Sequence, residues 1–335
     1  MRYDTKIMPL RTPGAINEAA KLILSGELVA IPTETVYGLA ANAFDENAVR
    51  KIFEVKGRPA DNPLIVHTYG IDGVSEIAEE IPETAKKLFE NFSPGPLTIV
   101  LKKNPKIPQI TSGGLGTVGV RIPDIADIRE LIKICGVPIA APSANLSGLP
   151  SPTSARHVFN DLQGKIPLIL DGDECKIGLE STVISLQNED IKILRPGNIT
   201  KENLSEFGKV IVDEGVTGEL SGIPASPGMK YKHYAPKADI TLIEGELPFF
   251  IYYFNKNADE DTFALMFDDD ECAIKNRINF GKTSKDQAAN LFKTLRELDE
   301  RSIKKVFARC PKKTDEGLAV YNRLIRAAAF KLHSF

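Results

Sequence analysis

Hydrophobic positions in the first part of the chain change repeatedly between a helical period and short apolar runs. In INEAAKLIL, residues 16–24, they recur three and four positions apart, and the following Gly26 predicts that this amphipathic helix stops there. LVAIPT, residues 28–33, is typical of a buried strand. The same patterns predict helices near 45–55, at 125–134 and from Pro152 or Thr153 to about 163, and strands at 63–67, 97–103, 117–122, 138–143, 167–172, 181–186 and 191–194. So many short strands among few helices favour a mixed, twisted sheet packed by helices.

A change in composition separates this part from the rest of the chain. Residues 213–238 are rich in glycine, proline and serine and show no clear period, which is typical of a linker. Long ordered loops usually serve a site, so this segment is either a plain tether or a lid. Beyond it we expect strands at 240–245, 249–254, 262–267 and 306–310, a helix capped by Ser284 and Gln287 that runs to about 299, and a last helix at 317–332. The predicted organisation is a first α/β domain at 1–212, the linker, and a smaller Rossmann-like α/β domain at 239–335.

Composition and charge narrow the class of protein. With 335 residues, the chain is long enough for two domains. Its start has no apolar leader and no run of eighteen apolar residues occurs, so we expect neither export nor membrane insertion, and a cytoplasmic enzyme. The cysteines Cys135, Cys175, Cys272 and Cys310 form no CxxC pair, which argues against a zinc site and against a disulfide framework. A formal charge of −3 argues against a bulk electrostatic grip on nucleic acid.

Polar loops follow the predicted strands of the first domain at several places. They are PTETVYGL (32–39), KGRPADNPLIVH (56–67), GTVGVRIP (116–123), APSANLSGLPSPT (141–153), GLESTV (178–183) and LRPG (194–197). Open α/β sheets bind ligands at strand ends. Together these loops carry Lys56, Arg58, Arg121 and Arg195 among many hydroxyls, which suits a polyanion.

Missing motifs restrict the chemistry further. The chain has no GxxxxGK[ST] loop, no GxSxG elbow, no HExxH and no GxGxxG. A site rich in cations and hydroxyls but without a nucleophile–base pair favours phosphoryl or nucleotidyl transfer, in which positioning and charge neutralisation supply most of the rate. For Glu34 and Glu180 we expect hydrogen bonds to loop backbone or to an arginine rather than metal binding. The acidic run at 268–272 is expected to be a solvated turn.

The order of these motifs resembles the Sua5/YrdC family of threonylcarbamoyl-AMP synthases, specifically its two-domain Sua5 type. The resemblance rests on PTETVYGL, KGRPADNPL, SPGPLT, TVGVRIP, PSANLSG and ESTV, and on SPGMKYKHYAP in the linker. It implies a YrdC-like catalytic domain and a nucleotidyltransferase reaction in which L-threonine, bicarbonate and ATP give L-threonylcarbamoyladenylate and pyrophosphate. The product would serve the threonylcarbamoyl modification of adenosine 37 in ANN-decoding tRNAs, through a downstream tRNA threonylcarbamoyl transferase machinery.

The resemblance also implies a role for individual residues. Lys56 and Arg58 would be catalytic, and Tyr234, with Lys230 and Tyr231, would come from the linker as a lid. ATP would be contacted by Lys56, Arg58, Asn62, Thr117, Ser143, Asn145, Ser151, Arg195 and Tyr234. L-threonine would be held by Thr35, His67, Arg121, the backbone at Ala141, and Ser181, with a two-pronged contact from Arg121 to its carboxylate. Mg²⁺ would be carried by the ATP phosphates, without protein ligands.

Two other functions remain open from the sequence. One is an RNA-binding YrdC-like module without synthase activity, although the negative charge and the few aromatic residues near the basic loops favour weak or no direct nucleic-acid binding. The other is a carbamoyl-transfer domain, because YrdC-like domains also occur in hydrogenase-maturation carbamoyltransferases. Those proteins bring zinc-finger-like segments, for which this chain has no matching cysteines.

Overall fold

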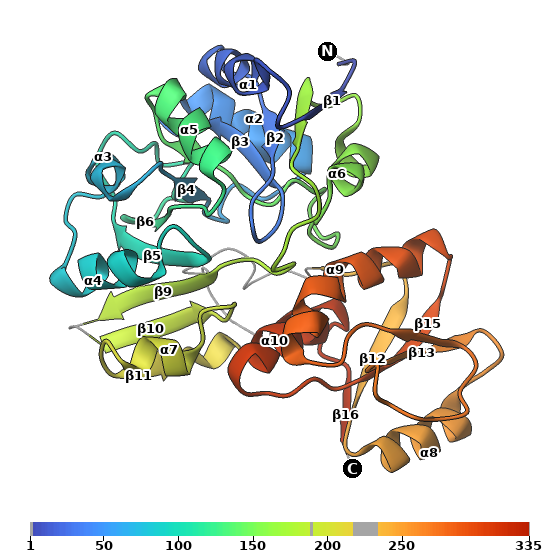
Figure 1. Cartoon of the computed structure of the whole chain (residues 1–335). Helices are drawn as coiled ribbons and strands as arrows, with labels where there is room; N and C mark the ends of the chain where they lie inside the picture. Colours follow the sequence, from blue (N-terminus) through green and yellow to red (C-terminus); the bar gives the residue numbers. More distant parts are fainter. Residues whose placement is uncertain (1–2, 188–189, 217–233, 335) are drawn as a thin grey trace. The chain divides into compact units, whose positions relative to one another are not determined.

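Two compact α/β units make up the chain in a computed structural model, which describes residues 3–187, 190–216 and 234–334 (Figure 1). The first unit takes in Met1–Ser147, Ser151–Lys176 and Glu180–Lys230, and the second takes in Gly148–Pro150, Ile177–Leu179 and Tyr231–Phe335. Most of the predicted linker, with Lys230 and Tyr231, lies outside the described residues. Among the described residues, no helix is both long enough and apolar enough to cross a membrane.

The first unit is built on an eleven-stranded sheet with the order β1-β8-β2-β3-β7-β4-β6-β5-β9-β10-β11. Its strands are β1 (Lys6–Pro9), β2 (Val29–Ile31), β3 (Gly38–Asn42), β4 (Ile65–His67), β5 (Leu97–Lys102), β6 (Thr117–Arg121), β7 (Ile139–Ala140), β8 (Leu168–Asp171), β9 (Thr182–Gln187), β10 (Asp190–Arg195) and β11 (Val210–Val212). Strand β6 pairs in parallel with β4 and antiparallel with β5. The mixed sheet predicted from the sequence is therefore confirmed.

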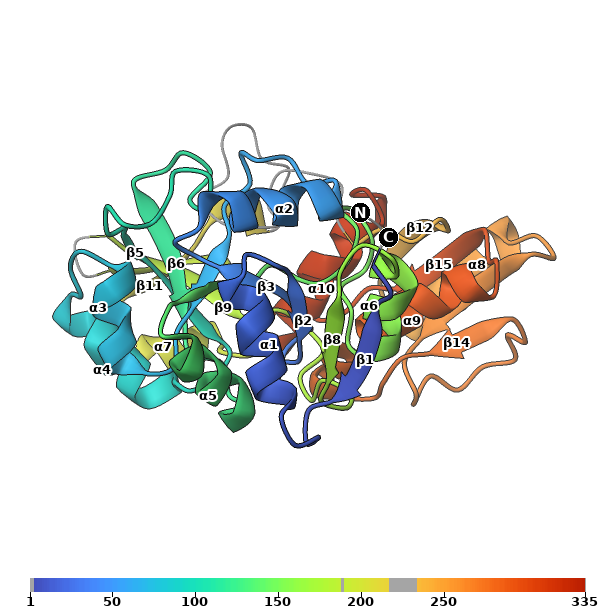
Figure 2. The same ribbon diagram turned by 90° about the horizontal axis from the view of Figure 1, so that it is seen from above.

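Helices cover both faces of this sheet. They are α1 (Ala15–Leu24), α2 (Glu46–Lys56), α3 (Val74–Ile77), α4 (Glu83–Phe92), α5 (Ala126–Cys135), α6 (Ala155–Leu162) and α7 (Lys201–Ser205). Helices α1 and α5 pack with Ile31, Ala40 and Ile139 in one apolar cluster, whereas α2 packs with Ala30, Leu39 and Val66 in another. The alternation of strand side chains explains these two clusters, and Figure 2 shows α2 and α1 on opposite sides of the sheet.

Local sequence signals fix the end of α2, where the first basic loop begins. Asp45 caps the helix by accepting hydrogen bonds from the N–H groups of Asn47 and Ala48. Gly57 ends it with a φ of 62°, a left-handed conformation that glycine adopts without strain. As a result Lys56 is the last residue of the helix and Arg58 starts the loop.

The second unit has a five-stranded sheet in which all pairs are parallel, in the order β14-β13-β15-β12-β16. The strands are β12 (Asp239–Glu244), β13 (Thr262–Met266), β14 (Arg277–Asn279), β15 (Lys305–Arg309) and β16 (Leu332–Ser334), and the helices are α8 (Leu247–Asn257), α9 (Ser284–Glu300) and α10 (Asp315–Ala327). Parallel strands joined by helices agree with the small α/β domain of Rossmann-like type that the sequence predicts.

Three expectations for this unit were wrong in detail. FFIYYF is part of helix α8 rather than a strand, because Pro248 suits a first helical turn and the aromatic rings stack four residues apart, as Phe250 does on Phe254. The capping box of α9 is formed by Thr283 and Asp286, one residue earlier than predicted. The last helix covers Asp315–Ala327, and the short strand β16 follows it.

Candidate active site

Two of the predicted site residues, His67 and Arg121, lie side by side on neighbouring strands of the first sheet. His67 ends β4 and is paired in register with Arg121, which ends β6. Arg121 is in turn paired with Thr98 near the start of β5. Because β4 and β6 are parallel and β5 is antiparallel to them, these residues gather at one edge of the sheet. The sequence prediction that strand ends carry the site is therefore consistent with the placement of His67 and Arg121.

Arg121 is held rigidly by the loop between β2 and β3. Its Nη2 donates to Glu34 Oε1 at 2.6 Å and to Thr35 Oγ1 at 2.9 Å, and its Nε donates to the carbonyl of Gly95 at 3.4 Å. The side chains of Arg121 and Glu34 are only 5% and 8% exposed, so the charges compensate each other away from water. Its Nη1 has no hydrogen-bond partner among the described residues and is the group left for a ligand.

His67 is buried next to this guanidinium. Burial, together with the positive charge of Arg121, lowers the pKa of His67 to about 3, so the imidazole is neutral near pH 7. Its Nδ1 has no hydrogen-bond partner among the described residues, although the side chain is only 3% exposed. A buried polar nitrogen without a partner costs free energy, which a ligand that bonds to it would recover.

We call the residues His67, Arg121 and Ser181 at this edge of the sheet the strip. Ser181 connects it to Arg195. The Ser181 hydroxyl is 2.7 Å from the Thr98 hydroxyl and accepts from Arg195 Nη2 at 3.1 Å, while the Ser181 carbonyl accepts from Arg195 Nε at 3.1 Å. On the other side of the sheet edge, the N–H of Ala141 donates to the carbonyl of Ile65. Because the Ala141 N–H is engaged in this bond, the Ala141 carbonyl is the backbone group that could accept a hydrogen bond from a ligand amine.

Lys56 fixes the loop of residues 143–147 by hydrogen bonds to its backbone. Its Nζ donates to the carbonyls of Ser143 and Asn145, both at 2.5 Å, and lies 3.5 Å from Asn145 Oδ1. The N–H of Ser147 donates back to the Lys56 carbonyl. The side chain is 3% exposed, so Lys56 fixes loop 143–147 and brings a positive charge into it.

Arg58 fixes its own loop in a similar way. Its guanidinium donates to the carbonyls of Asn62, at 3.4 Å, and Pro63, at 3.1 Å. Asn62 is 3% exposed, and its Oδ1 has no hydrogen-bond partner among the described residues. The Arg58 side chain, which is predicted to contact ATP, is therefore prearranged before any ligand binds, which lowers the entropy lost on binding.

The remaining predicted residues lie in different surroundings. Ser151 is fully buried, and its hydroxyl donates to Glu180 Oε1 at 2.6 Å. Thr117 is exposed at the start of β6, so about 13 Å of strand separates it from Arg121. Tyr234 belongs to the second unit, where it packs on Phe292 at 5.1 Å between ring centres and under Arg323.

Metal ligands are scarce in the part of the chain that the structure describes. No three His, Cys, Asp or Glu side chains of residues 3–187, 190–216 and 234–334 gather so that they could hold a metal ion. Glu34 and Glu180, the two buried acids of the site, are engaged with Arg121 and Ser151.

Sequence reasoning missed two hydroxyls that shape the site. Thr98 supports Ser181, and Thr33 lies 2.8 Å from the Thr35 hydroxyl while donating to the carbonyl of Val36. Both side chains are buried. Their only signal is a polar residue inside an apolar strand or at its end, in the motifs SPGPLT and PTETVYGL.

Comparisons with known proteins cover nearly the whole chain. Residues 21–197 match the Sua5/YciO/YrdC family model, described as "Telomere recombination", and residues 199–329 match the "Threonylcarbamoyl-AMP synthase, C-terminal domain". A Pyrococcus abyssi protein named threonylcarbamoyl-AMP synthase is 44% identical over 95% of each chain, and one from Bacillus subtilis is 42% identical over 93% of this chain and 92% of its own.

A solved structure agrees with both matches. The crystal structure of P. abyssi Sua5 complexed with L-threonine superposes with a TM-score of 0.91 at 40% identity and covers 99% of both chains. Two family models in the expected order and a superposition over both units leave one assignment: the chain belongs to the Sua5/YrdC family, in its two-domain Sua5 form.

Proposed function

We propose that this chain is a threonylcarbamoyl-AMP synthase, which converts L-threonine, bicarbonate and ATP into L-threonylcarbamoyladenylate and pyrophosphate. The observation that carries the proposal is the strip formed by His67, Arg121 and Ser181, beside two basic loops fixed by Lys56 and Arg58. The names of the P. abyssi and B. subtilis relatives, and the L-threonine bound to P. abyssi Sua5, support it.

The strip offers a complementary group for each part of an amino acid. The free Nη1 of Arg121 suits the carboxylate, since a charge-assisted hydrogen bond is stronger than a neutral one. The Ala141 carbonyl and the neutral imidazole of His67 can accept from the amine. A protonated histidine there would repel that amine, so its low pKa favours binding.

The basic loops suit the phosphates of ATP. Arg58, Asn62 and Lys56 lie on the loop after α2 or at its start, and Ser143 and Asn145 lie on the loop that Lys56 fixes. Positive charge that is already in place neutralises the growing charge on a departing pyrophosphate without reorganisation. Ser151 and Arg195 would meet the rest of the nucleotide, and Thr117 would have to contact it from the far end of β6.

The reaction needs no side-chain nucleophile in this scheme. The threonine amine and bicarbonate give a carbamate with loss of water, and a carbamate oxygen attacks the α-phosphorus. A new P–O bond forms while the bond to the pyrophosphate oxygen breaks, so pyrophosphate leaves with the electron pair. The protein's part is to hold the two reactants in line and to exclude water from the carbamate and the mixed anhydride.

Mg²⁺ would enter on the ATP phosphates. Linker residues around Tyr234 would close over the site, and the adenylate would pass to a separate enzyme that transfers the threonylcarbamoyl group to tRNA. The enzyme would work in the cytoplasm, where ATP and tRNA are found.

The identity of the product tests this proposal. The purified chain is incubated with ATP, L-threonine and ¹³C-bicarbonate, and the adenylate is weighed by mass spectrometry. We expect threonylcarbamoyl-AMP that carries the label. An unlabelled adenylate or none, together with salt-sensitive RNA binding, would favour the RNA-binding alternative instead.

A further inference from the structure

The second unit contains a cavity that the synthase reaction does not use. It has a volume of about 650 Å³ and is lined by residues that follow β12, β13, β14 and β15, together with the first turn of α9. Its polar lining includes Glu246, Asp269, Lys282, Gln287, Arg309 and Lys312. All four strands run in parallel, so the cavity lies at their carboxyl ends, where open α/β sheets bind ligands.

The topology explains why a hollow opens there. Strands β12 and β15 are neighbours, yet the chain leaves β12 towards α8 and leaves β15 towards α10. Helix α8 packs on the sheet face that carries Ile243, Met266 and Phe307, whereas α9 and α10 pack together on the other side of the sheet (Figure 1). When the loops after two adjacent strands turn towards opposite faces of the sheet, they diverge, and a crevice forms between them.

Arg309 presents a fixed positive charge in this cavity. Its Nε donates to Asp270 Oδ2 at 3.2 Å and its Nη1 donates to the carbonyl of Gly245 at 2.8 Å. The guanidinium also lies over the rings of Phe250 and Phe267. Its Nη2 has no hydrogen-bond partner among the described residues. Lys282 and Lys312 line the same cavity, are exposed, and form no ion pair with any described residue.

Gln287 gives independent support for a ligand. The residue is 5% exposed and lines the cavity, and its Nε2 makes one long bond, 3.4 Å, to the carbonyl of Lys282. Its Oε1 has no partner in the part of the chain that the structure describes. An amide oxygen in the cavity lining, on a side chain that is otherwise largely buried, suits a donor such as a hydroxyl. The side-chain carboxylates of Glu246 and Asp269 add two further acceptors, because neither carboxylate forms a hydrogen bond or ion pair with a described residue.

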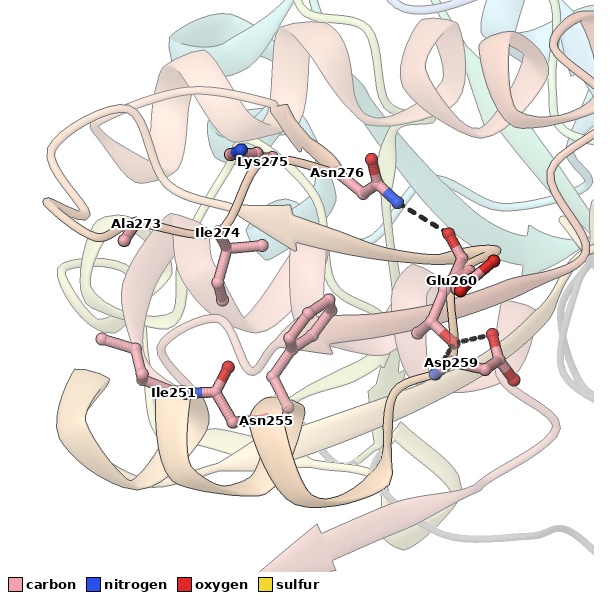
Figure 3. A pocket seen from close by; sticks show the side chains of 10 residues that line it. Ile251, Asn255, Asp259, Glu260, Ala273, Ile274, Lys275 and Asn276 are labelled. Carbon is pink, nitrogen blue, oxygen red and sulfur yellow. Dashed lines mark hydrogen bonds between the residues drawn. The ribbon is translucent and has the colours of Figure 1, made fainter.

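A second cavity among the described residues of this unit is different. It has a volume of about 460 Å³ and lies where β13 and β14 begin (Figure 3). Polar groups there are bonded to one another, as Asn276 Nδ2 is to the carbonyl of Glu260 at 2.9 Å and Thr262 Oγ1 is to Asp259 Oδ1 at 2.5 Å. Its Asp259 carboxylate is paired with Lys305 Nζ at 3.2 Å, and its lining holds no arginine. It therefore lacks the fixed guanidinium that points to an anionic ligand in the first cavity.

We propose that the cavity at the carboxyl ends of β12, β13, β14 and β15 binds a phosphorylated sugar, either free or as part of a nucleotide. Arg309, Lys282 and Lys312 would hold the phosphate, next to the amino end of α9. Gln287, Glu246 and Asp269 would accept hydrogen bonds from sugar hydroxyls. This site is separate from the proposed synthase site and does not depend on the synthase activity.

Hydrogen exchange followed by mass spectrometry on the full chain locates such binding. Ribose 5-phosphate, AMP, ribose and adenosine are each added at millimolar concentration. We expect ribose 5-phosphate, and AMP if a base is tolerated, to slow exchange several-fold in peptides that cover 267–287 and 309–312. Ribose and adenosine should leave those peptides unchanged. AMP protection confined to residues 56–62 and 143–147, with no effect of ribose 5-phosphate, would overturn the proposal.

Variants test which charges matter. In Lys282→Ala/Lys312→Ala, two exposed side chains are lost without disturbing the core, and the protection by ribose 5-phosphate should disappear. In the matched control Lys256→Ala/Lys275→Ala, the same charge is removed from the same unit outside this cavity, and protection should persist. Protection that survives the first double variant unchanged would contradict the assignment.

Discussion

Glu34 and Arg121 form a buried ion pair in which Oε1 and Nη2 are 2.6 Å apart. Both hydrogens of Nη2 are engaged, one by Glu34 and the other by Thr35. The two-pronged contact to a threonine carboxylate that the sequence suggests would therefore require Nη2 to release a partner. The arrangement favours a contact through Nη1 alone, with Glu34 setting the orientation of the guanidinium.

Replacing Glu34 by alanine should impair threonine binding selectively. Without the carboxylate, Arg121 loses its orientation and stays buried without a compensating charge. We expect the KM for L-threonine to rise about tenfold or more with the KM for ATP nearly unchanged, and the free energy of unfolding to fall by about 3 kcal/mol. Steady-state kinetics and urea unfolding measure the two effects. Glu54→Ala, an exposed acid on α2, is the control, and an unaltered threonine KM in Glu34→Ala would refute the positioning role.

Arg58→Ala should abolish most activity while the protein stays folded. Arg58 lies on a loop and donates to the carbonyls of Asn62 and Pro63, and we expect its loss to remove the positive charge that neutralises the phosphates. We expect pyrophosphate release to fall by two orders of magnitude or more, roughly the effect of losing one group that stabilises transition-state charge. Arg50→Ala, which removes an exposed arginine from α2, should keep normal turnover. Normal turnover in Arg58→Ala would end its phosphate assignment.

His67 should make the protein sensitive to mild acid. The pKa of His67 is about 3 in the folded protein and about 6.5 in an unfolded chain. Between pH 3 and pH 6.5 the imidazole is therefore protonated in the unfolded state and neutral in the folded state. The stability that this difference provides is present above pH 6.5 and is lost as the pH falls, by up to about 1.4 kcal/mol per pH unit. Urea unfolding of the chain and of His67→Gln between pH 4 and 7 measures it, and equal slopes in the two proteins would contradict the assignment.

Removing the chain from residue 215 onward tests the linker. If the segment around Tyr234 closes over the site, the truncated protein should bind L-threonine but release pyrophosphate much more slowly, because water reaches the carbamate. Circular dichroism checks that the first sheet persists, and calorimetry measures threonine binding. A truncated protein with the full rate would make the linker a tether.

Several elements of the fold follow directly from the sequence, and others do not. The end of α5 at Gly136 is predicted because a left-handed glycine stops a helix, and its φ of 63° agrees. Strands β1, β14 and β16 are missed because they are three or four residues long and mostly exposed, so they have no apolar pattern. FFIYYF was predicted as a strand since a continuous aromatic run does not distinguish the two periods.

The site shows the same division. The loop position of Arg58 and the strand-end positions of His67 and Arg121 can be predicted, because charged side chains next to apolar runs mark the ends of elements. The role of Thr98 could not be assigned, because a polar residue in an apolar strand does not reveal its partner, which is the Ser181 hydroxyl. The pairing of Glu34 with Arg121 joins residues 87 positions apart, which no local pattern reports.

Threonine-dependent release of pyrophosphate tests the central claim most directly. The chain is incubated with ATP and bicarbonate, and pyrophosphate is measured with L-threonine, with L-serine and without an amino acid. The account predicts rapid release with L-threonine, slower release with L-serine, whose missing methyl costs about 1–3 kcal/mol in an apolar pocket, and almost none without an amino acid. Release at the same rate in all three conditions, or in none, would contradict it.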